Sequence, residues 1–221
     1  MTFISAAAAL AAVGHIARTG ELRARGVTTR ELARASNAGE IRRVRRGVYA
    51  GARTDDGMLH AAEHGGSVSC TTAGRMLGLW ILQEAAGMHL WLGREGNLRR
   101  CTRSRCAVRA HWDDGDGVLG RIPPVRNVLV QIAECAGEET FFAALESALR
   151  QSLLHPSDLR WLARRLPRDL HWLLAFARAD ADSRSPPDGR LRACCPWLIT
   201  GETRMRRRVR SGHAVLRIRL R

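Results

Sequence analysis

The residue types best suited to metal chemistry are a histidine pair and a cysteine pair. His60, Glu63 and His64 follow the order H-x-x-E-H, which formally matches an inverted zinc-protease motif. The segment is short and lies beside a loop, so a solvated helix face explains it more simply. Cys101 and Cys106 have four residues between them, but no second close pair of Cys or His completes a zinc site. We therefore expect no metal ligand and no cofactor.

Other catalytic patterns are weaker still. The acidic turn at Asp113, Asp114 and Asp116 is of a kind that attracts cations, but no glutamate follows it at the spacing of an EF-hand. All 36 basic residues are arginine, so a phosphate-binding loop with lysine is excluded. No nucleophile elbow of the G-x-S-x-G type surrounds Ser67. The sequence predicts that the protein is not an enzyme and has no catalytic residues.

The arginines are concentrated at the two ends of the chain. The formal net charge is +15, with 9 Arg against 3 acids in residues 1–50, 16 against 16 in residues 51–183, and 11 against 2 in residues 184–221. A lysine-free, arginine-rich composition also fits a GC-rich genome, so only the placement of the charge is informative. A localised basic surface attracts phosphates and favours a nucleic-acid partner.

The basic N-terminal part has the pattern of a winged helix-turn-helix over residues 20–51. Thr28 and Glu31 form a capping box that predicts a helix start, in which Thr28 accepts from a backbone N–H and Glu31 reaches back. Leu32 and Ala35 then turn toward a core with other apolar residues. The opposite face, expected to read DNA, comprises Thr29, Arg30, Ala33, Arg34 and Asn37.

A hairpin follows this helix, since Gly39 is a helix stop and Arg46-Gly47 is a turn signal. Its apolar positions are Ile41, Val44, Val48 and Tyr49. Its outward arginines, expected to contact DNA as a wing, are Arg42, Arg43, Arg45 and Arg46. We expect the first helix to span residues 5–18, with Leu10, Val13 and Ala17 in one stripe and a stop at Gly20. The alternative is a small structural helical bundle with a solvated basic surface.

The rest of the chain predicts an α+β protein with three parts. The winged helix covers residues 1–52, an α/β and helical domain covers 56–183, and an arginine-rich tail covers 184–221. Within the second part we expect a helix at 58–64, strands at 67–70, 88–92 and 107–112, a helix at 71–79, and four helical segments from residue 125. No apolar stretch is long enough for a membrane span, and no signal peptide is recognisable. We expect a cytoplasmic protein with no membrane partner.

Four segments carry a resemblance to a known family. They are RARGVTTRELARASNAGEIRRVRRGVYAG, GGSVSCTTAGRMLGLWIL, MHLWLGR and ALESALRQSLLHPSDLRWLARRLPR. Over about residues 4–183 the chain resembles the actinobacterial branch of the AbiEi-type antitoxins of type IV toxin-antitoxin systems. The resemblance implies a winged helix joined to an α/β domain. It also places Thr28, Thr29, Arg30 and Arg34 on the DNA-reading helix, and the four hairpin arginines on or beside the wing.

Many relatives of this branch continue into a domain similar to very-short-patch-repair endonucleases, but this chain departs there. Residues 184–221 contain only Asp188 and Glu202 as acids, so no carboxylate pair is available to hold a catalytic metal. We interpret the tail as the product of a shifted reading frame or truncation. We expect it to be disordered, although HAVLRIRL alternates as one strand does.

The sequence thus predicts a sequence-specific DNA-binding transcriptional regulator that represses its own operon as an AbiEi-like antitoxin. Its expected partners are a double-stranded DNA operator, a nucleotidyltransferase-like toxin system and a second copy of the chain in a homodimer. Two alternatives stay open. One is a truncated, inactive remnant of an endonuclease protein, and the other is a toxin-counteracting protein that acts through its middle domain.

Overall fold

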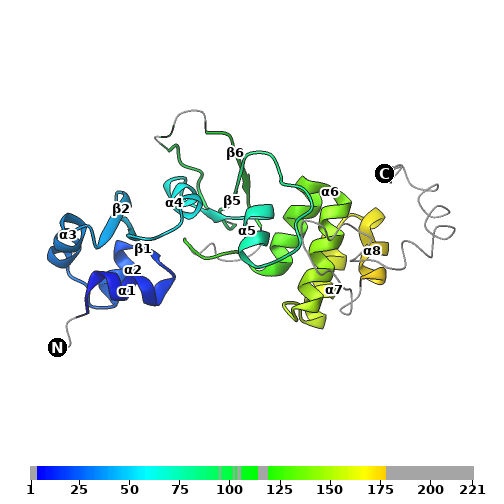
Figure 1. Cartoon of the computed structure of the whole chain (residues 1–221), viewed down its shortest axis with the longest axis horizontal. Helices are drawn as coiled ribbons and strands as arrows, with labels where there is room; N and C mark the ends of the chain where they lie inside the picture. Colours follow the sequence, from blue (N-terminus) through cyan, green and yellow to red (C-terminus); the bar gives the residue numbers. More distant parts are fainter. Residues whose placement is uncertain (1–3, 95, 102, 104–105, 114–118, 178–221) are drawn as a thin grey trace.

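The N-terminal elements form a winged helix at one end of an elongated molecule (Figure 1). The computed structural model describes residues 4–94, 96–101, 103, 106–113 and 119–177. The first six elements are α1 (Ala6–Val13), β1 (Ile16–Arg18), α2 (Thr19–Ala24), α3 (Thr29–Asn37), β2 (Ile41–Arg45) and β3 (Val48–Gly51). The predicted winged helix within an α+β fold is therefore confirmed.

The wing is a three-stranded antiparallel sheet in the order β1-β3-β2. Arg43 lies opposite Tyr49, and Arg45 lies opposite Val48, with a register shift between Arg43 and Arg45. The turn falls at Arg46-Gly47, as predicted, because Gly47 adopts a φ of 77° that glycine tolerates without strain.

The predicted first helix over residues 5–18 is wrong in its second half. Helix α1 ends at Val13, and Gly14 follows in the left-handed region with φ 100°, donating its N–H to the Leu10 carbonyl. The backbone then forms strand β1, which pairs with β3. Gly20, the predicted stop, lies inside α2. Pairing with β3 buries Ile16 and satisfies backbone groups that a longer helix would have used.

Helix α3 begins as predicted, but its capping box forms only in part. The Thr28 hydroxyl accepts from the Glu31 N–H at 3.1 Å. The Glu31 carboxylate does not reach back to Thr28; it accepts from the Ala6 N–H at 3.2 Å, at the first residue of α1. It also receives two hydrogen bonds from Arg34, at 2.7 and 2.9 Å. The partial positive charge of a helix N-terminus and a guanidinium together outcompete the local backbone partner.

Apolar packing fixes the rest of the winged helix. Leu32 and Ala35 are buried with Leu22 and Val27, as predicted from helical spacing. Each of these side chains is at most 2% exposed. On the outer face of α3, Thr29, Arg30, Ala33 and Asn37 remain exposed.

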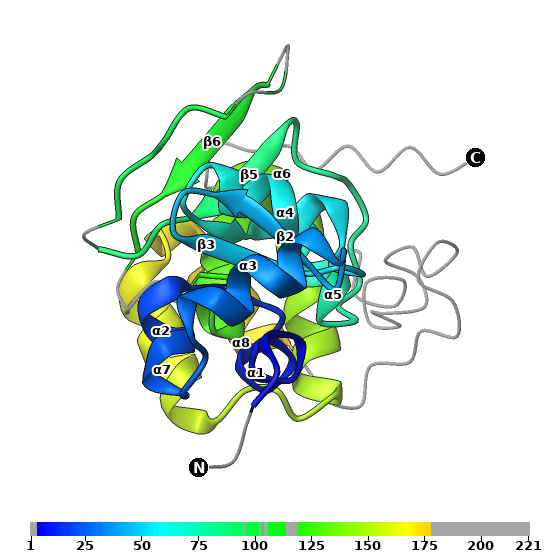
Figure 2. The same cartoon turned by 90° about the vertical axis from the view of Figure 1, so that its left-hand side faces the viewer.

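The middle region contains a second sheet, and a helical layer follows it (Figure 2). The elements up to the sheet are α4 (Asp56–Glu63), β4 (Ser67–Val68), α5 (Cys70–Met76), β5 (Met88–Trp91) and β6 (Val108–His111). The sheet order is β4-β5-β6, with β4 antiparallel and β6 parallel to β5. The helical layer consists of α6 (Val125–Arg150), α7 (Pro156–Arg165), η1 (Arg168–Leu170) and α8 (His171–Phe176). Gly137, at φ 82° and ψ 170°, interrupts α6 between the two predicted helical segments.

The winged helix and the middle region share an apolar cluster. Ile16 and Val48 of the first sheet pack with Leu59 and Ala62 of α4 and with Leu119. A Cβ atom on Gly120 would lie 2.6 Å from the Ile16 Cβ atom. The wing is thus braced from behind by α4 and by the segment around residue 120.

Two expectations concern other parts of the chain. The tail of residues 184–221, with its predicted strand, lies outside the described residues. Among the residues that the structure describes, no helix is long and apolar enough to cross a bilayer.

Replacing Glu31 tests its place in this fold. We expect Glu31→Ala to lower the urea midpoint of unfolding clearly more than Glu40→Ala does, because it leaves the Ala6 N–H and the Arg34 guanidinium without their buried acceptor. The hydrogen bond with Arg34 lowers the pKa of Glu31. Its contribution is therefore present above the ordinary carboxyl pKa and is lost as the pH falls below it. Equal midpoints for the two variants would contradict this assignment.

Candidate nucleic-acid interface

The outer face of α3 presents most of the residues predicted to read DNA. Thr29, Arg30, Ala33 and Asn37 are all exposed, and Thr28 stands at the cap position. No ion pair joins Arg30 to another residue in the described part of the chain. Its guanidinium is therefore available to a ligand, on a helix of the kind that enters the major groove.

Arg34 lies on the same face but is already engaged. Its guanidinium is bound bidentately by Glu31 and by Glu40, whose oxygens lie 2.8 Å from Nη1 and Nη2. These two carboxylates raise the pKa of Arg34 further above its ordinary value. Helical spacing did not predict the pairing with Glu40, because Glu40 lies beyond the end of α3 at Asn37. The arrangement makes Arg34 a link between α3 and the start of β2.

Three of the four wing arginines are exposed, and the fourth, Arg45, is half-buried. Arg43 and Arg46 are exposed, and Arg43 lies opposite Tyr49 on the side of the helices. Arg42 is exposed as well. The hydrogen bonds from Arg103 are the main cause of the lowered pKa of Asp56, and the positive charge of Arg42 lowers it slightly further.

Arg45 turns toward the middle region. Its Nε donates to the Ala62 carbonyl at 3.0 Å, at the end of α4. Its Nη2 is buried and has no hydrogen-bond partner among the residues that the structure describes. Burial lowers the pKa of Arg45, and the nearby charges of Arg99 and Arg18 lower it further. Arg45 therefore joins the wing to α4 and lies in a concentration of positive charge.

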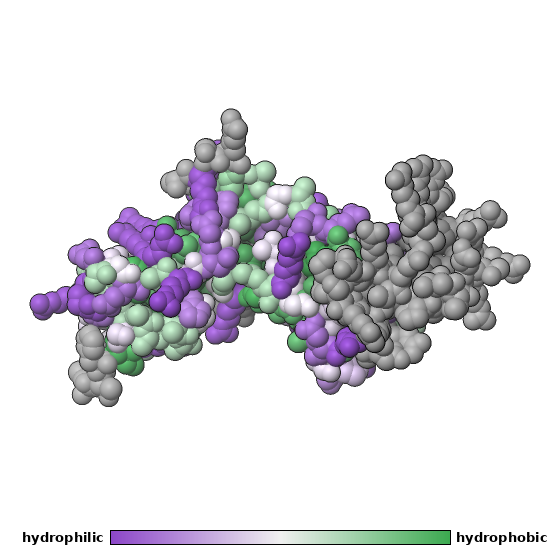
Figure 3. Space-filling model, in the orientation of Figure 1, coloured by the Kyte–Doolittle hydropathy of each residue, from purple (hydrophilic) through white to green (hydrophobic). Residues whose placement is uncertain are grey.

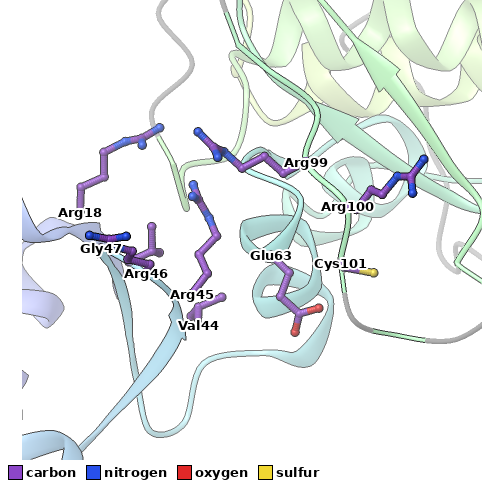
Figure 4. A pocket seen from close by; sticks show the side chains of 10 residues that line it. Arg18, Val44, Arg45, Arg46, Gly47, Glu63, Arg99, Arg100 and Cys101 are labelled. Carbon is purple, nitrogen blue, oxygen red and sulfur yellow. The ribbon is translucent and has the colours of Figure 1, made fainter.

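This positive charge lines a pocket between the wing and the middle region (Figure 4). The lining residues are Arg18, Val44, Arg45, Arg46, Gly47, Val48, Glu63, Arg99, Arg100 and Cys101. Hydrophilic side chains also project from the winged-helix end of the molecule in Figure 3. The single acid in the pocket, Glu63, is held by Arg103, whose Nε lies 3.1 Å from its carboxylate. Sequence reasoning missed Arg18, Arg99 and Arg100, although the basic loop at 94–106 was a signal.

The structure brings the histidine and cysteine pairs together. His60, His64, Cys101 and Cys106 place one ligand atom each within 4.8 Å of the others. The expectation that no close pair completes the Cys101/Cys106 pair is therefore wrong. The two histidines are close in sequence, and so are the two cysteines, but the histidine pair and the cysteine pair lie about 40 residues apart. They meet only because the fold brings the loop back over α4. Asp113 of the predicted acidic turn instead accepts from the Gln131 amide, and residues 114–118 lie outside the described chain.

A second buried polar group lies between the sheet and α6. His89 Nδ1 and His111 Nε2 are 3.0 Å apart, and the two rings stack. The Cys70 N–H donates to the Gln131 side chain at 2.9 Å. Burial raises the pKa of Cys70 to about 12. Burial also lowers the pKa of His111 to about 4, and the nearby charges of His89 and Arg109 contribute to that lowering. These groups form an uncharged network in the core at neutral pH.

Comparison with known proteins identifies the winged helix. Residues 5–50 match the model of a family described as transcriptional regulator, AbiEi antitoxin. The chain is similar to this family over its N-terminal region. The match includes α3 and almost all of the hairpin, and so covers every residue predicted to contact DNA. No curated protein is significantly similar to the chain.

Protonation of His111 is expected to destabilise the fold. Its pKa is about 4 in the folded chain, below the ordinary value of about 6.5, so the unfolded chain binds the extra proton between these two pH values. The contribution of neutral His111 is then complete above pH about 6.5 and falls progressively toward pH about 4, by about 3 kcal/mol at most. Urea unfolding at a series of pH values measures this loss. His111→Gln should flatten the dependence, and an unchanged slope in that variant would contradict it.

Proposed function

We propose that this protein is a sequence-specific, double-stranded-DNA-binding transcriptional regulator that represses its own operon. The observation that carries the proposal is an exposed helix α3, with a free Arg30, on a winged helix that matches an AbiEi antitoxin family. The adjacent wing adds exposed arginines at positions 43 and 46. Helix and wing are the two parts that such domains use to contact the duplex.

In this mechanism α3 enters the major groove with its outer face toward the base edges. Arg30 is suited to bidentate hydrogen bonding with guanine, and Asn37 is suited to adenine. Arg43 and Arg46 contact phosphates or the adjacent minor groove, where they set position and affinity without reading sequence. Arg34 does not read bases in this proposal, because two carboxylates occupy its donors. It fixes the angle between α3 and the hairpin.

The proposed surface continues into the middle region. Arg18 precedes α2, and Arg99 and Arg100 lie in the loop beside the wing turn. All three are exposed, so a phosphate backbone that follows the wing can reach them. Each phosphate neutralised in this way releases counterions and steepens the dependence of affinity on salt.

The antitoxin role adds two partners to the proposal. One is a toxin of the nucleotidyltransferase type, and the other is a second copy of this chain on an inverted repeat in the cytoplasm. A dimer would double the contacts of a single winged helix, which reads only a short site. Genome-wide binding with tagged protein tests the regulatory role directly. A site at the protein's own promoter supports it, and binding without sequence preference contradicts it.

Arg30 tests the reading helix. We expect Arg30→Ala to cost about 1–3 kcal/mol on the recovered operator and to relax the preference at one base position, with little change on random DNA. Fluorescence anisotropy on operator and scrambled duplexes measures both. Arg164→Ala, an exposed arginine on α7, is the charge-matched control and should bind as the wild type does.

Arg46 tests the wing. We expect Arg46→Ala to weaken binding by a similar factor on operator and scrambled DNA, and to reduce the slope of log affinity against log salt by about 1. Affinity titrations at several salt concentrations give this slope. If Arg30→Ala and Arg46→Ala both cause equal losses on the two duplexes, α3 is not the reading helix.

A further inference from the structure

Four potential metal ligands converge where the arginine-rich loop crosses helix α4. His60 Nε2 lies 3.0 Å from Cys106 Sγ and 3.6 Å from Cys101 Sγ. His64 Nε2 lies 3.1 Å from Cys106 Sγ. All four ligand atoms are within 4.8 Å of one another. Two imidazole nitrogens and two sulfurs therefore surround one small volume.

These separations fit a tetrahedral zinc ion. With Zn–S near 2.3 Å and Zn–N near 2.0–2.1 Å, a tetrahedral ion requires ligand atoms roughly 3.3–3.8 Å apart. Three of the separations are 3.0, 3.1 and 3.6 Å, and every pair of ligand atoms lies within 4.8 Å, so the cluster has the size of such a site. Two sulfur and two nitrogen ligands in a tetrahedral arrangement are typical of zinc. The H-x₃-H and C-x₄-C spacings also lie in the range found in zinc modules.

The surroundings already orient the ligands. His64 is 4% exposed, and its Nδ1 donates to the Arg99 carbonyl at 2.7 Å. That hydrogen bond places the ring proton on Nδ1 and leaves the Nε2 lone pair directed at the cluster, as in metal sites whose second ring nitrogen is held by a carbonyl. The four cysteines in the described part of the chain are free thiols, so Cys101 and Cys106 are available as ligands.

A salt-bridge network holds the cysteine loop in place. Arg103, between the two cysteines, donates to both Asp56 oxygens at 2.7 and 2.9 Å and to Glu63 at 3.1 Å. Both acids belong to α4, Asp56 as its first residue and Glu63 as its last. The loop is thus docked on the same helix that carries the two histidines. The acids are occupied by Arg103, which leaves the sulfur and nitrogen atoms as the ligand set.

We propose that His60, His64, Cys101 and Cys106 form a structural zinc site that fastens the arginine-rich loop to α4. Binding releases one proton from each thiol to solvent, and the two thiolates neutralise the charge of the ion. Four protein ligands leave no open coordination position, so the site has a structural role and no catalytic one. Its consequence is positional, because Arg99 and Arg100 come directly before Cys101 and line the pocket with the wing. The inference does not depend on DNA binding.

The test uses the full chain purified under reducing conditions. We expect one zinc per chain by elemental analysis after dialysis against metal-free buffer, and replacement by Co²⁺ should give the ligand-field absorption of a tetrahedral site with sulfur ligands. A chain that retains no zinc when supplied with Zn²⁺, and gives only the spectrum of hydrated Co²⁺, overturns the proposal.

Variants locate the site. Cys101→Ser with Cys106→Ser should abolish zinc retention, whereas Cys101→His should retain Co²⁺ with weaker sulfur charge-transfer absorption. Cys135→Ser is the matched control, since Cys135 lies in another group of potential ligands with Cys70 and His89. It should keep the full zinc content. Loss of zinc in Cys135→Ser with retention in the double variant would move the ion to that group and overturn the assignment.

Limited trypsin digestion gives a readout of the structural role. Zinc removal should speed cleavage within residues 94–106 by at least about tenfold, because an untethered loop opens more readily to a protease. Cleavage in α7, on the far side of the molecule, serves as the internal control. An unchanged rate in the loop after zinc removal would contradict the fastening role even if the ion binds.

Discussion

The buried Glu31 carboxylate is the interaction on which the winged helix depends. A carboxylate that is 5% exposed is costly unless its charge and lone pairs are satisfied. Here the N-terminus of α1 and the guanidinium of Arg34 satisfy it together. The hydrogen bond from Ala6 to Glu31 joins α1 to the first turn of α3. The ion pair between Arg34 and Glu40 then joins α3 to the residue just before the hairpin. The relative placement of helix and wing, which any DNA contact needs, therefore rests on one small ionic network.

Contacts within the protein also determine which arginine donors remain for a ligand. Arg34 and Arg103 bind carboxylates, and Arg45 donates through its Nε to a carbonyl. The planar guanidinium, with several donors in a fixed fork, can bridge two acids at once, which an ammonium group does less well. In a chain without lysine the same residue type serves both structure and binding. Exposure and existing partners separate the two uses, and composition alone does not.

Local signals in the sequence predicted local structure well. The Thr28 cap, the stop at Gly39 and the Arg46-Gly47 turn are properties of a few adjacent residues, so pattern was sufficient. Features that depend on contacts between distant residues were missed. The Glu31 carboxylate accepts a hydrogen bond from the Ala6 N–H, 25 residues away, and not from the backbone N–H of its own helix cap, Thr28. The sequence did not predict that the histidine and cysteine pairs meet, because His60 and Cys106 are 46 positions apart and nothing local indicates that the loop returns to α4. Strand β1 was predicted as helix because its partner β3 is distant in sequence.

The pocket between the wing and the loop brings basic residues from two regions of the chain into one surface. Arg18, Arg45 and Arg46 approach from the winged helix, and Arg99 and Arg100 approach from the loop on α4. Like charges this close repel one another. Burial lowers the pKa of Arg45, and the nearby charges of Arg99 and Arg18 lower it further. The apolar cluster around Ile16 and Leu59 holds the two sides together against this repulsion. An anion between them removes the repulsion and adds attraction, so a phosphate backbone gains more from this surface than from the same arginines dispersed. A bound polyanion would therefore offset the repulsion among these arginines in the free protein.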